Sequence, residues 1–484
     1  MPRLSPDTLC DVAPEVRLPA YAREAVGAGI VHLGIGAFHR AHQALYTDEL
    51  LARHGGDWGI IGVSLRSACV AQQLQPQAGL YSLLSVDAQG QSLRVIGAVK
   101  SVLVATREPD AVVAAIADPA IQVITLTITE KGYCVGQDGR SLNIHDADIA
   151  HDLQNPGHPR TALGFLAMGL HRRMARGAAA LTLLSCDNLA QNSRVLRAVL
   201  IDYLQRTWPE VVTWLEECVR FPCSVVDRIV PAMTAARRAQ QEQALGVCDA
   251  GAVAAEPFCQ WIIEEDFAAA RPPWDVAGAQ FVASVAPYEA VKLRLLNASH
   301  SAIACLGLLV GAQTVDAVMA QPPLRGFIDG LMTRELMPTL QVPAHFDLAA
   351  YKDSLVQRFD NPWLAHRCAQ IAMDSSEKIA QRWLPTLQIA LSPALVAALS
   401  LWCALILLTD TDVEDAQAGP LLRARASGSA LAKRIGEVLA CARITPASVA
   451  DFDHLLAMLV RNLDNYQRCG VPGVLDAPAP RATA

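Results

Sequence analysis

Hydrophobic and polar residues follow two different patterns along the chain, and the change falls near residue 286. Before that point, short apolar runs typical of strands separate stretches with helical spacing. The runs 29–33, 58–65, 121–129 and 178–186 are predicted strands, and 41–53 is a predicted helix. Strands that alternate with helices predict an α/β domain built on a parallel sheet.

The second pattern is helical throughout. From about residue 286 to Cys469, apolar residues recur at helical spacing and strand-like runs are scarce. Prolines in 271–274 and at Pro287 mark the crossover. A chain of 484 residues is also longer than one hydrophobic core usually reaches. We therefore predict an α/β domain over 1–285 and a mostly α-helical domain over 286–484.

One segment of the second domain has two interpretations. The run 391–408 (LSPALVAALSLWCALILL) is about as long and apolar as a short membrane span. It contains Ser392, Pro393 and Ser400, and no Lys or Arg flanks it to set an orientation. A helix that is apolar all round is also typical of the core of a large protein. We expect a buried core helix, with a membrane span as the alternative.

Composition narrows the class of protein. Hydrophobic residues make up 52% and charged residues 18%, and the net charge is -7, so no basic excess is available to bind nucleic acid. The 13 cysteines are scattered without a CxxC pair, and the N-terminus lacks the apolar stretch of an export signal. We expect a cytoplasmic protein, a monomer or small homo-oligomer, with neither a membrane nor a nucleic acid as partner.

A glycine turn follows the first predicted strand. Gly34 permits a tight turn, and Gly36 lets the backbone approach a pyrophosphate that rests on the next helix. The third glycine of the usual GxGxxG is missing, because His39 and Arg40 follow Phe38. Spacing alone leaves an ordinary strand-to-helix turn open, but the strand-turn-helix context favours a dinucleotide contacting Gly34, Gly36 and Phe38.

The end of the second strand normally reads the adenosine ribose. A carboxylate there binds the 2′-hydroxyl of NAD, whereas an arginine accommodates the 2′-phosphate of NADP. Residues 64–67 read SLRS, with no carboxylate. Arg66 is therefore a predicted cofactor contact, and NADP stays open beside NAD.

Three polar residues mark the segment 288–300, YEAVKLRLLNASH. If it forms one α-helix, Lys292 and His300 lie roughly 80° apart, and Asn297 and His300 roughly 60° apart. A buried lysine loses affinity for its proton and can act as a base. Asn and His can donate to an oxygen on which charge develops. An ordinary amphipathic helix with a solvated polar face is the alternative.

The order of motifs resembles a known family. HLGIGAFHRAHQALYTDEL, TITEKGY, SCDNLAQN, FPCSVVDRIVP and KLRLLNASH follow one another as in the polyol-specific long-chain dehydrogenase/reductase family, also called the mannitol dehydrogenase family. The resemblance runs from about residue 28 to about residue 470. It implies a Rossmann-type domain over 1–285, a helical substrate-binding and catalytic domain over 286–484 and a site between them.

The resemblance also implies roles for single residues in a metal-independent reaction with NAD. Lys292 would be the general acid/base, Asn297 and His300 would hold the reacting oxygen, and Glu130 would relay protons to solvent. Three further residues would bind cofactor and substrate: Asn188, Asp227 and Arg228.

The substrate implied by the resemblance is a sugar acid. TITEKGYC, FPCSVVDRIVP and the segment 366–382 are most similar to the fructuronate reductase (mannonate oxidoreductase) branch. A carboxylate substrate needs cationic partners. The candidates are Lys131, Arg367, Lys378 and Arg382, and surface charge is the alternative for each. The family usually has glycine where this chain has Ala298 and Ser375, which puts the shape of the pocket in doubt.

We therefore expect hydride transfer between NAD(H) and the secondary alcohol or ketone of D-mannonate/D-fructuronate. A dehydrogenase of a neutral polyol, mannitol or arabinitol, is the second hypothesis. A non-catalytic dinucleotide sensor is the third, and it does not require the complete set of Lys292, Asn297, His300 and Glu130.

Overall fold

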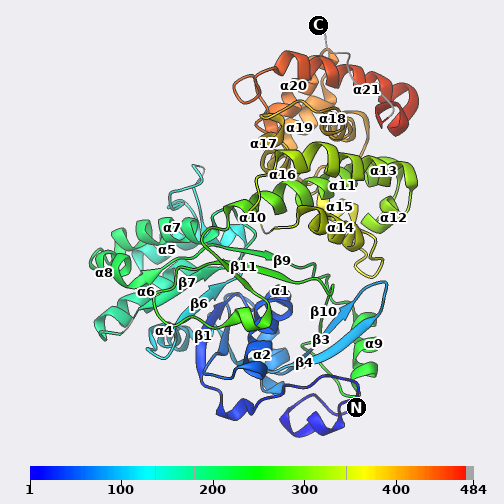
Figure 1. Cartoon of the computed structure of the whole chain (residues 1–484). Helices are drawn as coiled ribbons and strands as arrows, with labels where there is room; N and C mark the ends of the chain where they lie inside the picture. The colour runs from blue at the N-terminus through cyan, green and yellow to red at the C-terminus, as the bar shows by residue number, and fades with distance from the viewer. Residues whose placement is uncertain (137, 179, 345, 476–484) are drawn as a thin grey trace. The chain divides into compact units, whose positions relative to one another are not determined.

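In the computed structural model, which describes residues 1–136, 138–178, 180–344 and 346–475, six parallel strands form the main sheet (Figure 1). The strands are β1 Ala28–Leu33, β2 Gly59–Ser64, β5 Val99–Val104, β6 Val123–Leu126, β7 Leu181–Ser185 and β8 Val219–Arg220. Their order is β5-β2-β1-β6-β7-β8, which is the 3-2-1-4-5-6 order of a Rossmann sheet. The four predicted strands are β1, β2, β6 and β7, although Ala179 of the last predicted run lies outside the described residues.

Helices cover both faces of this sheet. Val31 and Leu33 of β1 pack into one apolar core with α4, α6 and α7, and Ile30 packs into a second core with α2. Burial on both faces explains why the strands are apolar almost throughout. The helices are α1 Ala37–Ala41, α2 Gln43–Arg53, α3 Cys69–Leu74, α4 Pro109–Ala117, α5 Ala147–Gln154, α6 Ala162–Ala175, α7 Asn192–Thr207, α8 Glu210–Cys218 and α9 Ala235–Leu245.

The helix after the glycine turn differs from the prediction of 41–53. Helical structure begins at Ala37 and is interrupted at His42, whose φ and ψ of -124° and -89° separate α1 from α2. The predicted helix began at residue 41 and so left out His39 and Arg40, which are both buried in α1. The prediction failed because these polar side chains face the interior.

Two small sheets in the same unit were not predicted. Their orders are β10-β3-β4 and β12-β11-β9, and several of their strands are too short to give a clear alternating pattern. Their bounds are β3 Tyr81–Val86, β4 Gln91–Ile96, β9 Ser224–Asp227, β10 Val253–Ala255, β11 Gln260–Glu264 and β12 Gln280–Val282.

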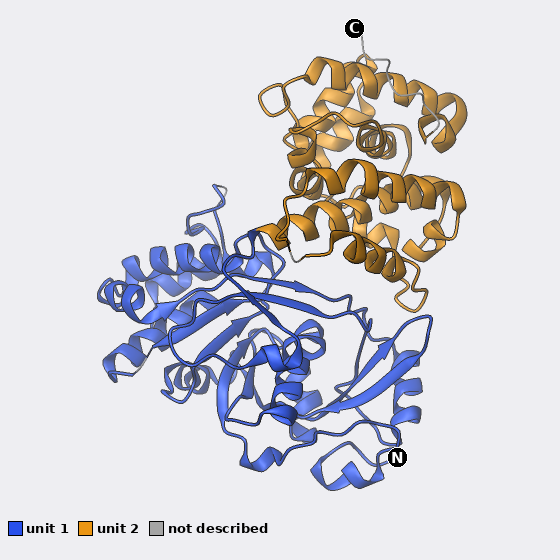
Figure 2. Cartoon of the chain, viewed as in Figure 1, with its two compact units in different colours: residues 1–286 blue, residues 287–484 orange. Residues whose placement is uncertain are grey.

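The chain divides into two units, Met1–Ala286 and Pro287–Ala484 (Figure 2), and the second is helical. Two short π-helical turns, Lys292–Asn297 and Leu331–Leu336, interrupt its α-helices. The α-helices from this boundary onward are α10 Ala286–Val291, α11 Ala298–Val310, α12 Val315–Met319, α13 Pro322–Gly330, α14 Leu348–Phe359, α15 Cys368–Ala372, α16 Ser375–Arg382, α17 Leu384–Leu387, α18 Pro393–Leu408, α19 Ala418–Ala426, α20 Leu431–Cys441 and α21 Phe452–Leu475.

The ambiguous run 391–408 forms a core helix. Every residue of α18 from Leu395 to Leu407 is buried, and the helix packs against α11 and α21. The prediction of a buried helix is thus confirmed. Among the described residues, only the helical stretch Ala286–Val310 is long and apolar enough to cross a membrane, and 72% of its most apolar window is buried in the structure.

Candidate active site

The main sheet has a switch point between β1 and β6. From β1 the chain proceeds to β2 and β5 on one side, and it then returns to β6 on the other side. At such a point the loops that follow the strands diverge and leave a crevice, which is where open α/β sheets bind ligands. The turn at Gly34 follows β1, and the segment 127–133 follows β6.

Gly34 and Gly36 differ in backbone conformation and in the space available for a side chain. Gly34 has a φ of +94°, and a Cβ atom there would stand 2.1 Å from the carbonyl oxygen of Thr127. A Cβ atom on Gly36 would meet only the carbonyl oxygen of Gly34, at 3.7 Å. The first glycine is therefore required by the turn itself. The second leaves an open backbone surface at the start of α1, where the half-buried Phe38 stacks on His42.

A buried histidine ties the two loops of the switch point together. The ring of His32 in β1 contacts the hydroxyls of Thr125 and Thr127 at 2.7 and 2.9 Å, and the Thr127 hydroxyl donates to the Gly34 carbonyl at 2.9 Å. Burial lowers the pKa of His32 to about 3, so the ring is neutral at physiological pH.

Asp187 organises the segment that carries Glu130 and Lys131. Its carboxylate accepts hydrogen bonds from the backbone N–H groups of Ile128 and Thr129, both at 2.9 Å, and from the Tyr133 hydroxyl at 2.7 Å. Glu130 and Lys131 begin a 3₁₀ turn, Glu130–Tyr133, and both are exposed.

The backbone just before this turn is strained. Thr129 has a φ of +64°, which a β-branched residue rarely adopts and which is frequent near functional sites. Sequence reasoning missed Asp187, although an acid directly after a buried parallel strand is a usable signal.

A cavity of about 600 Å³ lies at the carboxyl ends of β2 and β5. Arg66 lines it, with a side chain that is 90% exposed and 3.8 Å from the Asp148 carboxylate. The walls come from the segments after β2 and β5 and from α4, α5 and α6, and they include Leu65, Thr106, Val113, Arg160, Phe165 and Met168. The end of β2 is where a Rossmann sheet holds the adenosine part of a dinucleotide.

The remaining predicted residues of this unit have different surroundings. Asn188 is exposed in the turn after β7, and Asp227 is buried at the end of β9. Arg228 is 6% exposed, and its guanidinium donates to the carbonyls of Glu256 and Ala41 and to the Ser85 hydroxyl. These contacts hold Arg228 inside the fold, and its expected role in substrate binding stays a prediction.

In the second unit, the segment with the Lys-Asn-His set is not one regular α-helix. Lys292–Asn297 is π-helical and is followed directly by α11, which carries His300. A π-helix pairs residues i and i+5, so Lys292 and Asn297 lie one turn apart on the same side. In an α-helix they would differ by roughly 140°. The assumption of a single α-helix is thus wrong, and the π-helical turn places the two residues on the same side of the helix.

Polar atoms without a hydrogen-bond partner among the described residues gather on this segment. On the segment they are Asn297 Nδ2, Ser299 Oγ and His300 Nε2. Close by is Nδ1 of His366, whose ring stands edge-on to His300 with centroids 5.3 Å apart. Asn297 and His300 are 8% and 7% exposed. Buried polar groups are almost always satisfied, so unsatisfied ones mark a place where a ligand or water completes the bonding. His366 was not predicted, although it opens the quoted segment 366–382.

Two arginines lie near the His300 ring. Burial, together with nearby His366, Arg358 and Arg382, holds the pKa of His300 well below its usual value. Lys378 acts in the same direction on the pKa of His366, after burial. Sequence reasoning also missed Arg358, because a buried arginine in a helix looks like any amphipathic position.

The three predicted cations of this unit are held differently. Arg382 donates to the Asn297 carbonyl at 3.2 Å and to the Ser301 hydroxyl at 2.9 Å, so it is bonded to the Lys-Asn-His segment itself. Lys378 donates to the Ile371 carbonyl at 3.1 Å. Arg367 is exposed just before α15.

The two departures from glycine are accommodated. Ala298 is fully buried in α11. Ser375 begins α16, where its hydroxyl bonds to the Asp415 carboxylate at 3.2 Å and accepts from the Trp402 indole at 3.0 Å. The positive φ of this turn, +50°, falls on Asp374, so Ser375 needs no glycine-like backbone.

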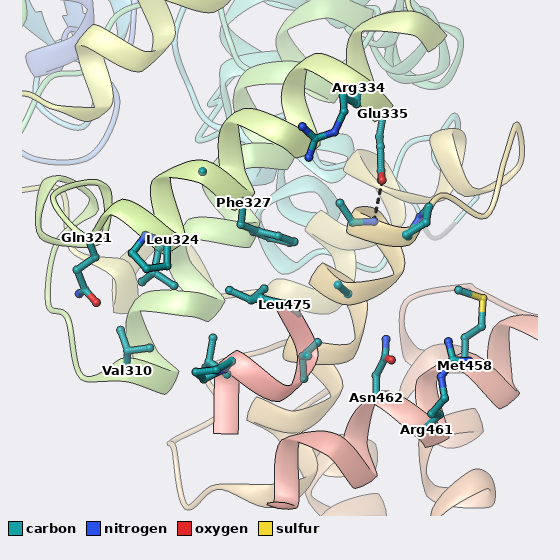
Figure 3. Close-up of a pocket in the computed structure, with 18 residues that line it drawn as sticks. Val310, Gln321, Leu324, Phe327, Arg334, Glu335, Met458, Arg461, Asn462 and Leu475 are labelled. Atoms are coloured by element: carbon teal, nitrogen blue, oxygen red, sulfur yellow. Dashed lines mark hydrogen bonds between the residues drawn. The ribbon is translucent and has the colours of Figure 1, made fainter. Parts of the chain in front are cut away.

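Another cavity in this unit, of about 700 Å³, lies away from these residues (Figure 3). Its walls come from α13, the second π-helical turn, the start of α18 and α21, and they include Phe327, Arg334, Met458 and Asn462. None of the predicted catalytic residues lines it. Among the described residues, no group of three or more His, Cys, Asp or Glu side chains is arranged to hold a metal ion.

A Rossmann sheet with a glycine turn at its switch point, in one chain with a helical Lys-Asn-His segment, defines the class of Rossmann-fold oxidoreductases. The model of the mannitol dehydrogenase Rossmann domain matches residues 28–276, and that of the mannitol dehydrogenase C-terminal domain matches residues 284–467. The chain belongs to the mannitol dehydrogenase family.

Named relatives cover most of the chain. D-mannonate oxidoreductase of Escherichia coli (strain K12) is 42% identical over 79% of this chain and 80% of its own length. Polyol:NADP oxidoreductase of Gluconobacter oxydans (strain 621H) is 37% identical over 80% of each chain. The solved Pseudomonas fluorescens mannitol 2-dehydrogenase, in ternary complex with NAD and D-mannitol, has a TM-score of 0.86 and 33% identity, and covers 98% of this chain and 99% of that one.

Proposed function

We propose that this protein transfers hydride between NAD(H) and the secondary alcohol or ketone of a sugar acid, D-mannonate/D-fructuronate, with Lys292 as general acid/base. The observation that carries the proposal is the π-helical alignment of Lys292 with Asn297, beside unsatisfied polar atoms on Asn297 and His300. We place the reaction in the cytoplasm, in keeping with 13 cysteines that are all free thiols.

The first unit is suited to bind the dinucleotide. Gly36 leaves the backbone open at the start of α1, where a pyrophosphate would rest. The cavity beside Arg66 has room for the adenosine part, with Phe38 near the glycine turn as a further contact. We keep Asn188 and Asp227 as cofactor contacts and Glu130 as proton relay. When bound, the cofactor accepts a hydride from the substrate carbon or returns it.

The second unit supplies the proton chemistry. In the oxidation, neutral Lys292 takes the proton of the substrate hydroxyl, and in the reduction the ammonium form returns it. The Asn297 amide donates to the same oxygen through Nδ2. His300 is neutral because burial lowers its pKa, so it can donate through Nε2 only as the tautomer that carries the proton there. These donors stabilise the negative charge that develops on the oxygen, and a preorganised, buried pair does so best.

A carboxylate substrate fits the cations near His300, where Arg358 and Arg382 both act to lower the pKa of the ring. Arg367 and Lys378 remain our candidates for holding it, with Lys131 from the first unit. The likeness to D-mannonate oxidoreductase supports this choice. A neutral polyol is the second candidate, and it is favoured by the likeness to the mannitol 2-dehydrogenase that holds D-mannitol.

One assay separates the candidates. Purified protein with NADH or NADPH is offered fructuronate, tagaturonate and fructose, and absorbance of the reduced cofactor is followed. Turnover of fructose alone would contradict the sugar-acid proposal, and turnover of none would favour the non-catalytic sensor.

Two lysine variants test the base in the same assay. Lys292→Met should lower kcat by at least about 100-fold, the usual size of a general acid–base contribution, while cofactor binding persists. Lys352→Met is the matched control, since Lys352 pairs with Asp329 at 2.6 Å in the same unit and has no proposed role. Equal activity of the two variants would show that Lys292 is not the base.

A further inference from the structure

We propose that Arg294 is a positioning residue that holds Lys292 and Asn297 in π-helical register. The inference rests on the proposed function of Lys292. The guanidinium of Arg294 fastens the turn to the helical segments around it, and the alignment of the base with the oxygen-binding amide depends on that attachment.

The π-helical turn needs external support. A π-helix occurs mostly as a single turn inside α-helices, because regular α-helical hydrogen bonds are otherwise preferred. Without support, Lys292–Asn297 would revert to an α-helix, and its i and i+5 side chains would turn away from each other by roughly 140°. What holds the turn therefore decides whether Lys292 and Asn297 address the same oxygen.

Arg294, in the middle of the turn, provides one attachment. Its Nε donates to the Thr386 hydroxyl at 3.2 Å, and its Nη2 donates to the Thr339 hydroxyl. The Thr339 hydroxyl in turn donates to the carbonyl of Leu336 at 2.7 Å. Leu336 ends the second π-helical turn, so Arg294 joins both π-helical turns and α17.

The chemistry of this attachment argues for positioning rather than stability. Arg294 is half-buried, and its hydrogen-bond partners among the described residues are two neutral hydroxyls. Burial lowers its pKa, which reflects the cost of holding this charge away from water. The cost of partly burying an unpaired guanidinium offsets part of what its two hydrogen bonds contribute to folding stability. Its two directed hydrogen bonds do fix the angle of the turn.

A second attachment comes from the end of α16. Arg382 donates to the Asn297 carbonyl, and the Trp383 indole donates to the Ala298 carbonyl at 3.1 Å. These carbonyls lie where the π-helical turn passes into α11, and donors from another helix stabilise such a junction. The turn is thus fastened in its middle and at its end, and Arg294 holds the part nearest Lys292.

The test compares Arg294→Lys and the double variant Thr339→Val/Thr386→Val with Arg334→Lys. Arg334 occupies an exposed position in the second π-helical turn and is the matched control. A lysine cannot make two forked hydrogen bonds, and valine keeps the shape of threonine without its hydroxyl. The measurements are kcat, KM for the cofactor, the pH profile of kcat and Tm.

We expect kcat to fall 10- to 100-fold in Arg294→Lys and in the double valine variant. The apparent pKa that the pH profile of kcat gives for the general base should rise toward the value of an exposed lysine, about 10.4. KM for the cofactor should stay within about 2-fold, Tm should fall by only a few degrees, and Arg334→Lys should match the wild type. A merely structural role would lower Tm and leave the pH profile unchanged.

The proposal is overturned if both variants keep kcat within 2-fold of Arg334→Lys with an unchanged pH profile. The Lys292→Met variant distinguishes failure of the positioning role of Arg294 from failure of the proposed function. If Lys292→Met is active, the base assignment is wrong. If it is inactive while the Arg294 variants behave as wild type, only the positioning role is wrong. Loss of both kcat and folding would also contradict it, and crystal structures of the valine variant would show directly whether the turn has become α-helical.

Discussion

The imidazole rings of His32 and His39 are stacked with their centroids 3.4 Å apart, and neither ring is exposed. Burial lowers both pKa values, that of His32 to about 3. Unfolded histidines titrate near 6.5, so the folded state excludes protons that the unfolded state binds. Their stabilising effect is complete above pH 6.5 and is lost as the pH falls below it. At pH 5, the burial of neutral His32 alone should lower the free energy of unfolding by about 2 kcal/mol relative to pH 8.

Urea unfolding at pH 8 and pH 5 measures this loss. His32→Asn, which can still hydrogen-bond Thr125, should reduce the difference in the free energy of unfolding, whereas the exposed His54→Gln should retain it. If His32→Asn keeps the full pH dependence, the burial argument is wrong.

Alanine at the two turn glycines should have opposite effects. Gly34→Ala meets the Thr127 carbonyl and a positive φ, so it should destabilise the protein by at least about 2 kcal/mol. Gly36→Ala has room for its methyl group and should fold normally, but it should weaken cofactor binding about 10-fold, because the methyl covers the backbone that a pyrophosphate approaches. Thermal unfolding and fluorescence titration with NADH give the two readouts. Equal Tm values for both variants would contradict the assignment.

Asp187→Asn should disturb the Glu130 segment. The neutral amide cannot accept three hydrogen bonds as strongly as the carboxylate, so we expect a loss of about 1–3 kcal/mol in stability and a lower kcat. Tyr133→Phe removes only the hydroxyl contact and should have a smaller effect on both. Chemical unfolding and turnover assays check the order, and a larger effect of Tyr133→Phe would show that Asp187 is not the organising residue.

The sequence predicted the elements that bury apolar side chains and missed the features that depend on buried polar side chains. Continuous apolar runs predicted β1, β2, β6, β7 and the buried α18, because burial of apolar surface determines those elements. Polar residues that face inward were not predicted: the helix was expected to begin at residue 41, yet His39 and Arg40 are buried in α1, which begins at Ala37. The π-helical turn was not predicted either, because Arg294 binds Thr339 and Thr386, which are distant from it in the sequence.

Arg367 and Lys378 provide a test of substrate charge. If they hold a carboxylate, Arg367→Gln and Lys378→Gln should each raise KM for fructuronate about 10-fold or more and change KM for fructose far less. Arg443→Gln is the control, because Arg443 is an exposed residue that pairs with Glu377 at 3.1 Å. Steady-state kinetics with both substrates decides, and equal effects on the two KM values would favour the polyol hypothesis.

The exposed Arg66 provides a test of cofactor choice. A guanidinium at the end of β2 favours a 2′-phosphate, so Arg66→Ala should raise KM for NADPH about 10-fold and leave KM for NADH within about 2-fold. The ratio of kcat/KM for NADPH and NADH measures the change. If the ratio does not move, Arg66 does not contact the ribose end of the cofactor.

The burial of α18 also affects how the protein is inactivated by heat. When the helical unit opens, an uninterrupted stretch from Leu395 to Leu407 that was wholly inside becomes available to other chains. Chains that expose such a stretch aggregate faster than they refold. Heat inactivation should therefore be irreversible, with a rate set by the unfolding of the helical unit. The shelf life of the enzyme would then depend on the height of that barrier, and its apparent melting temperature would rise with the scan rate.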